Sequence, residues 1–248
     1  MIDAPADDPF AGWPAEGQVF PLAGLAIRLA AGPHPFHAAE HVAAAANWQA
    51  EIAANPALFN GDMLLIDAPV LAAGVLAANA HVTPYATFLL WRRRQPDCKG
   101  FHLFGLPLVV SSDGALIAVR MSRHTANPGK VYCAAGSLEP NDVADGRVDL
   151  FANMAREVHE EIGLVLADAR ADATVHAVRV DRAVTVLRVY RFGSTADELL
   201  AGIATHILHA EEQEIDQALA IRDARPDAFA YPAFMPPVLA WFFDREKR

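Results

Sequence analysis

The chain has 248 residues, of which 53% are hydrophobic and 20% charged, the balance of an ordinary globular protein. This length accommodates one large domain, or a standard domain with a smaller companion, and either can bury a sizeable core. Thirty acidic residues against twenty basic ones give a formal net charge of -10. Such a field repels polyanions and argues against nucleic-acid binding as the main function.

Cysteine content and hydropathy bear on the cellular compartment. Two cysteines, Cys98 and Cys133, do not make a disulfide scaffold, and the start of the sequence shows neither the basic nor the apolar segment of a signal peptide. The most apolar stretch, residues 66–82, contains polar residues and is too short to span a bilayer. We therefore expect a cytoplasmic protein with no membrane role.

The first hundred residues contain one strong helix signal. An alanine-rich helix is predicted over residues 37–54, and it should end at Asn55 because a residue before proline disfavours helical geometry. We expect a poorly ordered start over residues 1–17 and an extended segment over 19–31. Two apolar runs follow at residues 63–66 and 87–91, and then a polar stretch at 92–97. The polar stretch indicates a division between two regions near residue 100.

Beyond residue 100 the pattern changes to short strands separated by turns. Asp113-Gly114 lies between two apolar runs and is typical of a hairpin turn. The predicted strands cover residues 106–110, 115–120, 131–134, 174–179 and 185–191, and the predicted helices cover 150–162, 196–209 and about 237–243.

The helix predicted over residues 150–162 has well-defined ends. Asp149 is a good N-cap, and Gly163 is a good residue to end the helix in the left-handed conformation. At about 100° per residue, one face collects the apolar side chains that should pack on a core. These are Phe151, Met154, Ala155, Val158 and Ile162.

A second face of this helix, the acidic face, carries Glu157, Glu160 and Glu161, which we expect to point outward. Like charges at these spacings destabilise a bare helix by a few tenths of a kcal/mol per pair, so something should neutralise them. Arg156 can pair with Glu160 and orient it, but one guanidinium cannot balance three carboxylates. Oxygen ligands without a Cys or His cluster select Mg²⁺ or Mn²⁺ rather than zinc. A merely solvated, charged helix face is the alternative.

The acidic face belongs to a longer motif. Residues 156–164, REVHEEIGL, match in full the second half of the Nudix box, R-E-U-x-E-E-x-G-U, where U is a bulky aliphatic residue. The opening half is similar too, since Gly136 begins it and Asp142 lies where the pattern has its first glutamate. The sequence departs from the pattern between the halves, where residues 143–155 give thirteen positions instead of seven. About six residues are therefore inserted in the loop, and the role of Asp142 is open.

The resemblance to Nudix hydrolases implies a fold and an activity. The implied fold is α/β (α+β), a mixed sheet between helices in a catalytic domain over residues 101–248, with residues 1–100 as an accessory extension. The implied reaction is hydrolysis of a nucleoside diphosphate linked to another moiety. Extensions of this kind dimerise the protein, cover the substrate, or both, so a homodimer is one expectation.

The same resemblance implies the site residues. Glu157, Glu160 and Glu161 would hold Mg²⁺ or Mn²⁺, and the backbone carbonyl of Gly136 would add a ligand. Arg156 would orient Glu160. A glutamate in a late loop would act as ligand or base, and we assign this role to Glu212 within the cluster Glu211, Glu212 and Glu214.

Residues 55–61, NPALFNG, resemble a segment of eukaryotic Nudix UDP-glucose diphosphatases, which also have an N-terminal region and a lengthened box. A UDP-sugar is therefore the preferred substrate, with ADP-ribose and other nucleoside diphosphate derivatives next. Four aromatic residues are candidates to stack on a base, and the sequence does not choose among Phe59, Tyr85, Trp91 and Phe104.

Three alternatives remain beside this interpretation. A Nudix-fold binding or regulatory module without hydrolysis is one, although such modules typically lose the box carboxylates, which are all present here. His37 and Glu40-His41 spell H-x-x-E-H, the inverted zinc-protease motif, but no glutamate between Glu51 and Glu139 offers the further ligand. Cys133 is a core residue or, less simply, a nucleophile for which the sequence suggests no base.

Overall fold

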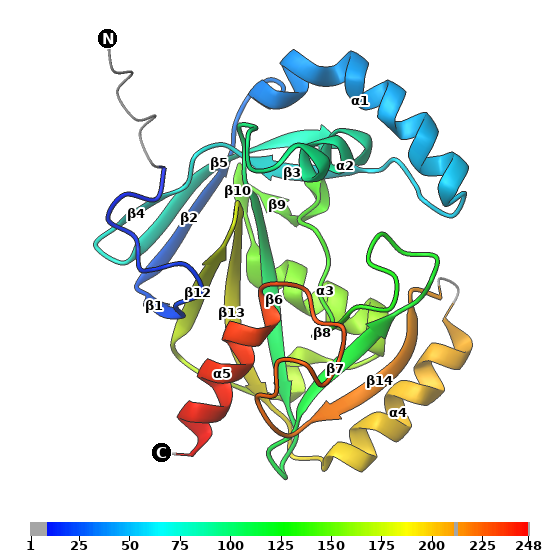
Figure 1. Cartoon of the computed structure of the whole chain (residues 1–248). Helices are drawn as coiled ribbons and strands as arrows, with labels where there is room; N and C mark the ends of the chain where they lie inside the picture. Colours follow the sequence, from blue (N-terminus) through cyan, green and yellow to red (C-terminus); the bar gives the residue numbers. More distant parts are fainter. Residues whose placement is uncertain (1–8, 211–212, 248) are drawn as a thin grey trace.

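The computed structural model describes residues 9–210 and 213–247, and these form two mixed β-sheets and five α-helices (Figure 1). The helices are α1 (Pro35–Ala54), α2 (Tyr85–Arg94), α3 (Leu150–Ile162), α4 (Ala196–His209) and α5 (Met235–Glu246), with short 3-10 turns at Pro140–Asp142 and Leu166–Asp168. None of the helices in these residues is long and apolar enough to cross a membrane.

The larger sheet carries most of the chain beyond residue 100. Its order is β1 (Phe20–Leu22), β12 (Val175–Val180), β13 (Ala183–Arg191), β6 (His102–Val110), β7 (Leu116–Met121) and β14 (Ile215–Ile221), with β11 (Arg170–Ala171) on β13 and β8 (Val131–Tyr132) on β7. β13 and β6 are parallel, and the other neighbours are antiparallel.

Helices cover both faces of the larger sheet. Successive residues of a strand point to opposite faces, and in β6 Gly105 lies against Met154 of α3 while Phe104 contacts Phe234, which precedes α5. A Cβ on Gly105 would approach Met154 Cγ to 2.8 Å, so glycine lets α3 pack closely on the strand. α4 packs beside α3 and along β14. The expected mixed sheet between helices is confirmed.

A second sheet, which the sequence did not reveal, is built mainly from the first hundred residues. Its order is β3 (Asp62–Ile66), β5 (Val75–Pro84), β2 (Gly24–Leu29), β10 (Arg147–Val148) and β9 (Val143–Ala144), with β4 (Val70–Ala72) on β5. β3 lies between two apolar cores because its side chains alternate. Leu64 and Ile66 join the large core around the larger sheet, whereas Met63 and Leu65 join a small core with α1 and α2.

The inserted loop of the Nudix-like box is the hairpin of β9 and β10. Asp145 and Gly146 at its tip have φ angles of 50° and 71°, and two consecutive positive angles are the mark of a tight turn that matches the twist of paired strands. Arg147 of β10 pairs with Arg28 of β2. The extra residues therefore extend the sheet of the N-terminal region instead of hanging free.

Both regions of the chain meet in both sheets. β1 from the N-terminal region pairs with β12, and a bridge joins Ile66 to Phe101. The Leu64 amide donates to the carbonyl of Leu138, inside the box, over 2.7 Å. The apolar core likewise runs across residue 100 without interruption.

Most predicted elements are confirmed, with instructive differences. α3 and α4 have the predicted bounds, α1 begins two residues before the predicted start, and the apolar run 87–91 is the middle of α2. β5 and β14 were missed because alanine-rich and mixed sequences such as VLAANAHVTP carry no clear alternation. Tertiary pairing decides such strands more than their own residues do. Residues 1–8 of the expected poorly ordered start lie outside the described residues.

We predict that a chain beginning at Lys99 is insoluble or much less stable than the whole protein. Removal of β1, β2 and β3 exposes the large core and leaves the β9–β10 hairpin without its partner strand. Soluble yield and the thermal unfolding midpoint measure this. A stable fragment with full activity would show instead that residues 1–98 are an independent module.

Candidate functional site

α3 holds the candidate site, and its ends are fixed as the sequence predicts. The Asp149 carboxylate accepts hydrogen bonds from the amides of Phe151 and Ala152, both at 3.0 Å. Gly163 ends the helix at a φ of 71°. The imidazole Nε2 of His206, on α4, lies 2.8 Å from the carbonyl oxygen of Glu160 and so holds the last turn of α3.

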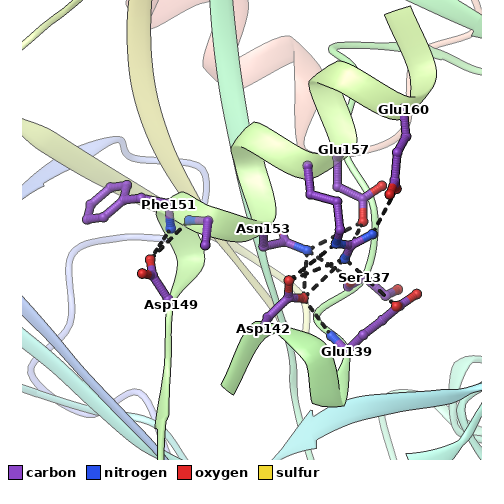
Figure 2. Close-up of polar contacts among 10 residues, drawn as sticks. Ser137, Glu139, Asp142, Asp149, Phe151, Asn153, Glu157 and Glu160 are labelled. Carbon is purple, nitrogen blue, oxygen red and sulfur yellow. Dashed lines mark hydrogen bonds and ion pairs between the residues drawn. The ribbon is translucent and has the colours of Figure 1, made fainter. Parts of the chain in front are cut away.

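Arg156 is the centre of an ion-pair network, and its partners Glu139, Asp142, Glu157 and Glu160 are labelled in Figure 2. Its guanidinium lies 2.8 Å from Glu157, 3.0 Å from Glu160, 3.2 Å from Asp142 and 3.9 Å from Glu139. The predicted pairing with Glu160 is present, but it is one of four. Since every side of the guanidinium already faces a carboxylate, Arg156 fixes the acidic residues and has little capacity left for an anionic ligand.

Asp142 is the buried anchor of this network. Only 5% of its surface is exposed, and its carboxylate accepts hydrogen bonds from Arg156, from the Glu139 amide and from Asn153 Nδ2, the last at 3.0 Å. Asn153 also donates to the Ser137 carbonyl and to Glu157. The aspartate in place of the family glutamate therefore still reaches the arginine despite the inserted hairpin. Asn153 was missed, because only its position one turn before Glu157 hinted at a role.

The acidic face does not point wholly outward, which corrects the expectation. Glu157 is 8% exposed and packs against Gly136, where a Cβ would come within 2.2 Å of Glu157 Oε2. A side chain at position 136 would have to displace the Glu157 carboxylate, so glycine allows that carboxylate to lie against the backbone. Leu150 and Asn153 are buried and Ala155 is exposed, so the buried stripe is rotated toward the carboxylates relative to the predicted one.

Burial perturbs two carboxylates of the acidic face. It raises the pKa of Glu157 from 4.5 to about 7, against the opposing charge of Arg156. Burial also raises the pKa of Glu161 well above its ordinary value, and the charges of Glu157 and Glu214 add to this increase. The Ala135 amide donates to Glu161 Oε2 over 3.1 Å. Glu160 is exposed and held by Arg156.

The donor chemistry of the acidic face fits a hard divalent cation. Burial is the main cause of the raised pKa values of Glu157 and Glu161, and neighbouring carboxylate charges add to it. Arg156 does not offset these effects, so the two carboxylates are undercompensated when ionised, and a bound cation would favour their ionised forms. Glu157 touches Gly136 and Glu161 binds the preceding amide, so both predicted ligands lie at one stretch of backbone. The side chains do not converge as a finished site, however: within residues 9–210 and 213–247, no group of three or more His, Cys, Asp or Glu residues could hold a metal ion as arranged.

The late-loop glutamates are only partly described. Glu212, the predicted ligand or base, and Glu211 lie outside the described residues. Glu214 is described, and its charge raises the pKa of Glu161. A late-loop carboxylate therefore does lie within electrostatic range of the acidic face, whereas the part of Glu212 stays a prediction.

The alternative catalytic residues have other contacts. His37 Nδ1 lies 2.7 Å from the Thr87 hydroxyl, and Glu40 pairs with Arg94 over 2.6 Å. His37 and Glu40 thus hold α1 and α2 together, whereas His41 contacts the Ala38 carbonyl of its own helix. Cys133 is buried, and burial raises the pKa of its thiol to about 12, as suits a core residue.

The four candidate stacking residues differ in accessibility. Trp91 is 1% exposed, stacks on Phe88 and belongs to the small core. Phe104 is 7% exposed and lies between the helices of the large core. Phe59 is 83% exposed and Tyr85 is half-buried, so these two remain available to a ligand.

We predict that, without metal, the protein loses stability between pH 5 and 8 because of Glu157. A carboxyl with a folded pKa of about 7 and an ordinary value of 4.5 contributes stability that is fully present below pH 4.5 and is lost as the pH rises through 7. Thermal unfolding in a chelator should therefore show a midpoint that falls by several degrees, and Glu157→Gln should flatten this slope.

Glu40→Gln, a helix glutamate outside the acidic face, is the matched control and should keep the slope of the unmodified protein. An equal slope in the Glu157→Gln protein would contradict the assignment.

Comparison with known proteins was made by sequence and by structure. No protein-family model matches the chain, and no curated protein does. Among solved structures, it is similar to the MutT protein from Methanosarcina mazei Go1, with 17% identity, 60% of this chain and 96% of that chain covered, and a TM-score of 0.41. It is also similar to a C. elegans Ap4A hydrolase, with 11% identity, 58% of this chain and 97% of that chain covered, and a TM-score of 0.43. For a NUDIX hydrolase from Nitrosomonas europaea the identity is 16%, the coverage is 60% of this chain and 91% of that chain, and the TM-score is 0.38. Scores and identities this low carry no inference about activity, which has to come from the site itself.

Proposed function

We propose that the protein is a metal-dependent hydrolase of the Nudix type that cleaves a nucleoside diphosphate linked to another moiety. The observation that carries this proposal is a pair of undercompensated carboxylates, the buried Glu157 and the partly buried Glu161, beside the backbone of residues 135–136. They belong to a motif whose every charged position in the second half is filled. Undercompensated carboxylates at one site are typical of metal-assisted phosphoryl chemistry.

Each residue of the site has its own role in the proposed reaction. Glu157, Glu160 and Glu161, with the Gly136 carbonyl, would hold Mg²⁺ or Mn²⁺. When bound, the cation supplies positive charge at the bridging and non-bridging oxygens of the diphosphate. Arg156 keeps Glu157 and Glu160 in fixed directions, and Asp142 in turn fixes Arg156. A late-loop carboxylate, Glu212 in this proposal, accepts the proton of the attacking water.

The preferred substrate is a UDP-sugar, with ADP-ribose and related nucleoside diphosphate derivatives next. Residues 55–61 support this choice, because their resemblance to the UDP-glucose enzymes extends beyond the box. A small anionic molecule, not nucleic acid, suits a chain of net charge -10 once a cation is bound. The two cysteines are buried and unpaired, in keeping with the cytoplasm. Homodimerisation through the N-terminal region stays a prediction.

A nucleotide-binding or regulatory module without hydrolysis is the alternative. Such a module has no need to retain carboxylates that oppose folding when ionised. Glu157 and Glu161 are both present here with raised pKa values, the first buried and the second partly buried, which favours the hydrolase.

Activity should require Mg²⁺ or Mn²⁺ and disappear in a chelator. Glu160→Gln and Glu161→Gln should each lower kcat by on the order of 10²-fold, because each removes a ligand while the shape of the side chain is kept. Phosphate or nucleoside monophosphate release across nucleotide sugars, dinucleotides and nucleoside triphosphates measures this, and it also identifies the substrate. Glu40→Gln is the control. Unaltered turnover in both site variants would refute the catalytic assignment.

Attack should fall on phosphorus and not on the sugar carbon, because the acidic face can place a cation only beside phosphate oxygens. With UDP-glucose the expected products are UMP and glucose 1-phosphate. Hydrolysis in ¹⁸O-labelled water followed by mass spectrometry locates the new bond. Label in either phosphate supports the proposal, whereas label in free glucose together with released UDP would show glycosidase chemistry.

A further inference from the structure

Three consecutive arginines, Arg92, Arg93 and Arg94, end α2, and Arg92 differs from the other two in its ion pairing. Arg93 pairs with Glu51 at 3.2 Å, and Arg94 pairs with Glu40 at 2.6 Å, both on α1. Arg92 is exposed and makes no ion pair with any residue that the structure describes. In a strongly acidic chain, a guanidinium left without a carboxylate among its described neighbours is a candidate to bind an external anion.

Hydrogen bonds connect Arg92 to the acidic face through the loop between β7 and β8. Arg92 Nη2 donates to Asn127 Oδ1 over 3.2 Å, and Asn127 Nδ2 donates to the Tyr132 hydroxyl over 3.3 Å. Three residues after Tyr132, the Ala135 amide donates to Glu161. A chain of contacts therefore runs from Arg92 to the acidic face, although α2 itself packs against β3 and β5 of the other sheet.

Electrostatic coupling supports the same placement. Burial raises the pKa of Tyr85, the charge of Arg92 lowers it, and the charge of Glu214 raises it. Glu214 in turn raises the pKa of Glu161. Arg92 and Glu214 thus each lie within electrostatic range of Tyr85, and Glu214 lies within range of the acidic face.

Residues 55–61 hold α2 and the loop in these positions. The Asn60 side chain accepts from the Ala86 amide over 2.7 Å, and the Gly61 carbonyl accepts from the Tyr85 amide over 2.8 Å, so they satisfy free donors at the start of α2. Asn55 Nδ2 donates to the His124 carbonyl over 2.9 Å and ties the end of α1 to the loop. This segment positions Arg92 and Asn127 relative to each other.

We propose that Arg92 binds a phosphate oxyanion of the diphosphate substrate, opposite the oxygens that face the metal-binding carboxylates, and that Asn127 sets its direction. The inference rests on the proposed function. Arg156, the arginine of the box, is surrounded by four carboxylates and cannot serve the substrate, so a second cation has to come from outside the box. The planar fork of arginine suits two oxygens of one phosphate.

The test compares Arg92→Ala with Arg93→Ala and Arg94→Ala, which remove the same charge from the same helical turn. For hydrolysis of the substrate found in the panel, Arg92→Ala should raise KM at least tenfold, while the two controls change it less than twofold. Arg92→Lys should lie between, because it keeps the charge and loses the fork. The thermal unfolding midpoints of Arg92→Ala and Arg92→Lys should match that of the unmodified protein, since Arg92 is exposed. Arg93→Ala and Arg94→Ala each lose one exposed ion pair to α1, so their midpoints should fall only slightly.

Titration calorimetry with UDP and Mg²⁺ separates this inference from the proposed function. UDP should bind the unmodified protein, and Arg92→Ala should weaken it at least tenfold even if no substrate in the panel is cleaved. Hydrolysis with an Arg92→Ala KM equal to that of the controls overturns the inference and leaves the proposed function intact. Binding of UDP that is equal in Arg92→Ala and Arg93→Ala, or no binding to the unmodified protein, overturns it as well.

Discussion

The pairing of Arg156 with buried Asp142 is the interaction on which the candidate site depends. A carboxylate that is 5% exposed is costly to bury unless it is paired and fully hydrogen-bonded. Asp142 meets this condition with a guanidinium, a backbone amide and the Asn153 amide group. Arg156 is fixed by this contact and can then hold Glu157 and Glu160. One guanidinium, itself held in place by Asp142, thereby orients Glu157 and Glu160, whose like charges repel each other.

The inserted hairpin solves a geometric problem that the longer loop creates. Six additional residues between Asp142 and the helix could have moved this anchor away from Arg156. Instead β9 leaves directly after Asp142 and β10 returns directly before Asp149, and the Asp149 amide donates to the Asp142 carbonyl over 2.8 Å. The hairpin thus brings Asp142 and Asp149 back together, as a shorter connection between them would.

The limits of the sequence interpretation follow from the range of the interactions. The bounds of α3, its caps and the pairing of Arg156 with Glu160 depend on residues within one or two turns, and all of these were predictable. The burial of Glu157 depends on Gly136, twenty-one residues earlier, and the second sheet depends on pairs such as Arg28 with Arg147. No local pattern contains that information. Asp142 is intermediate, because the family pattern indicated its place while only the structure indicated its partners.

The N-terminal extension and the inserted β9–β10 hairpin pair with each other in one sheet. The β9–β10 hairpin has too few residues to be stable alone, and it gains its edge partner from β2 of the N-terminal region. The same region carries α2, whose Arg92 has no ion pair among the described residues and donates to Asn127 in the loop between β7 and β8. Charge explains why an arginine from the N-terminal region is useful. The guanidinium of Arg156 on α3 is already paired with carboxylates, so a positive side chain for the substrate must come from elsewhere in the fold. A chain with a compact box loop would give the N-terminal sheet no β10 to pair with, and a chain without the extension would leave the hairpin edge and the apolar side of β3 exposed. The extension and the inserted hairpin thus each supply a strand that the other pairs with.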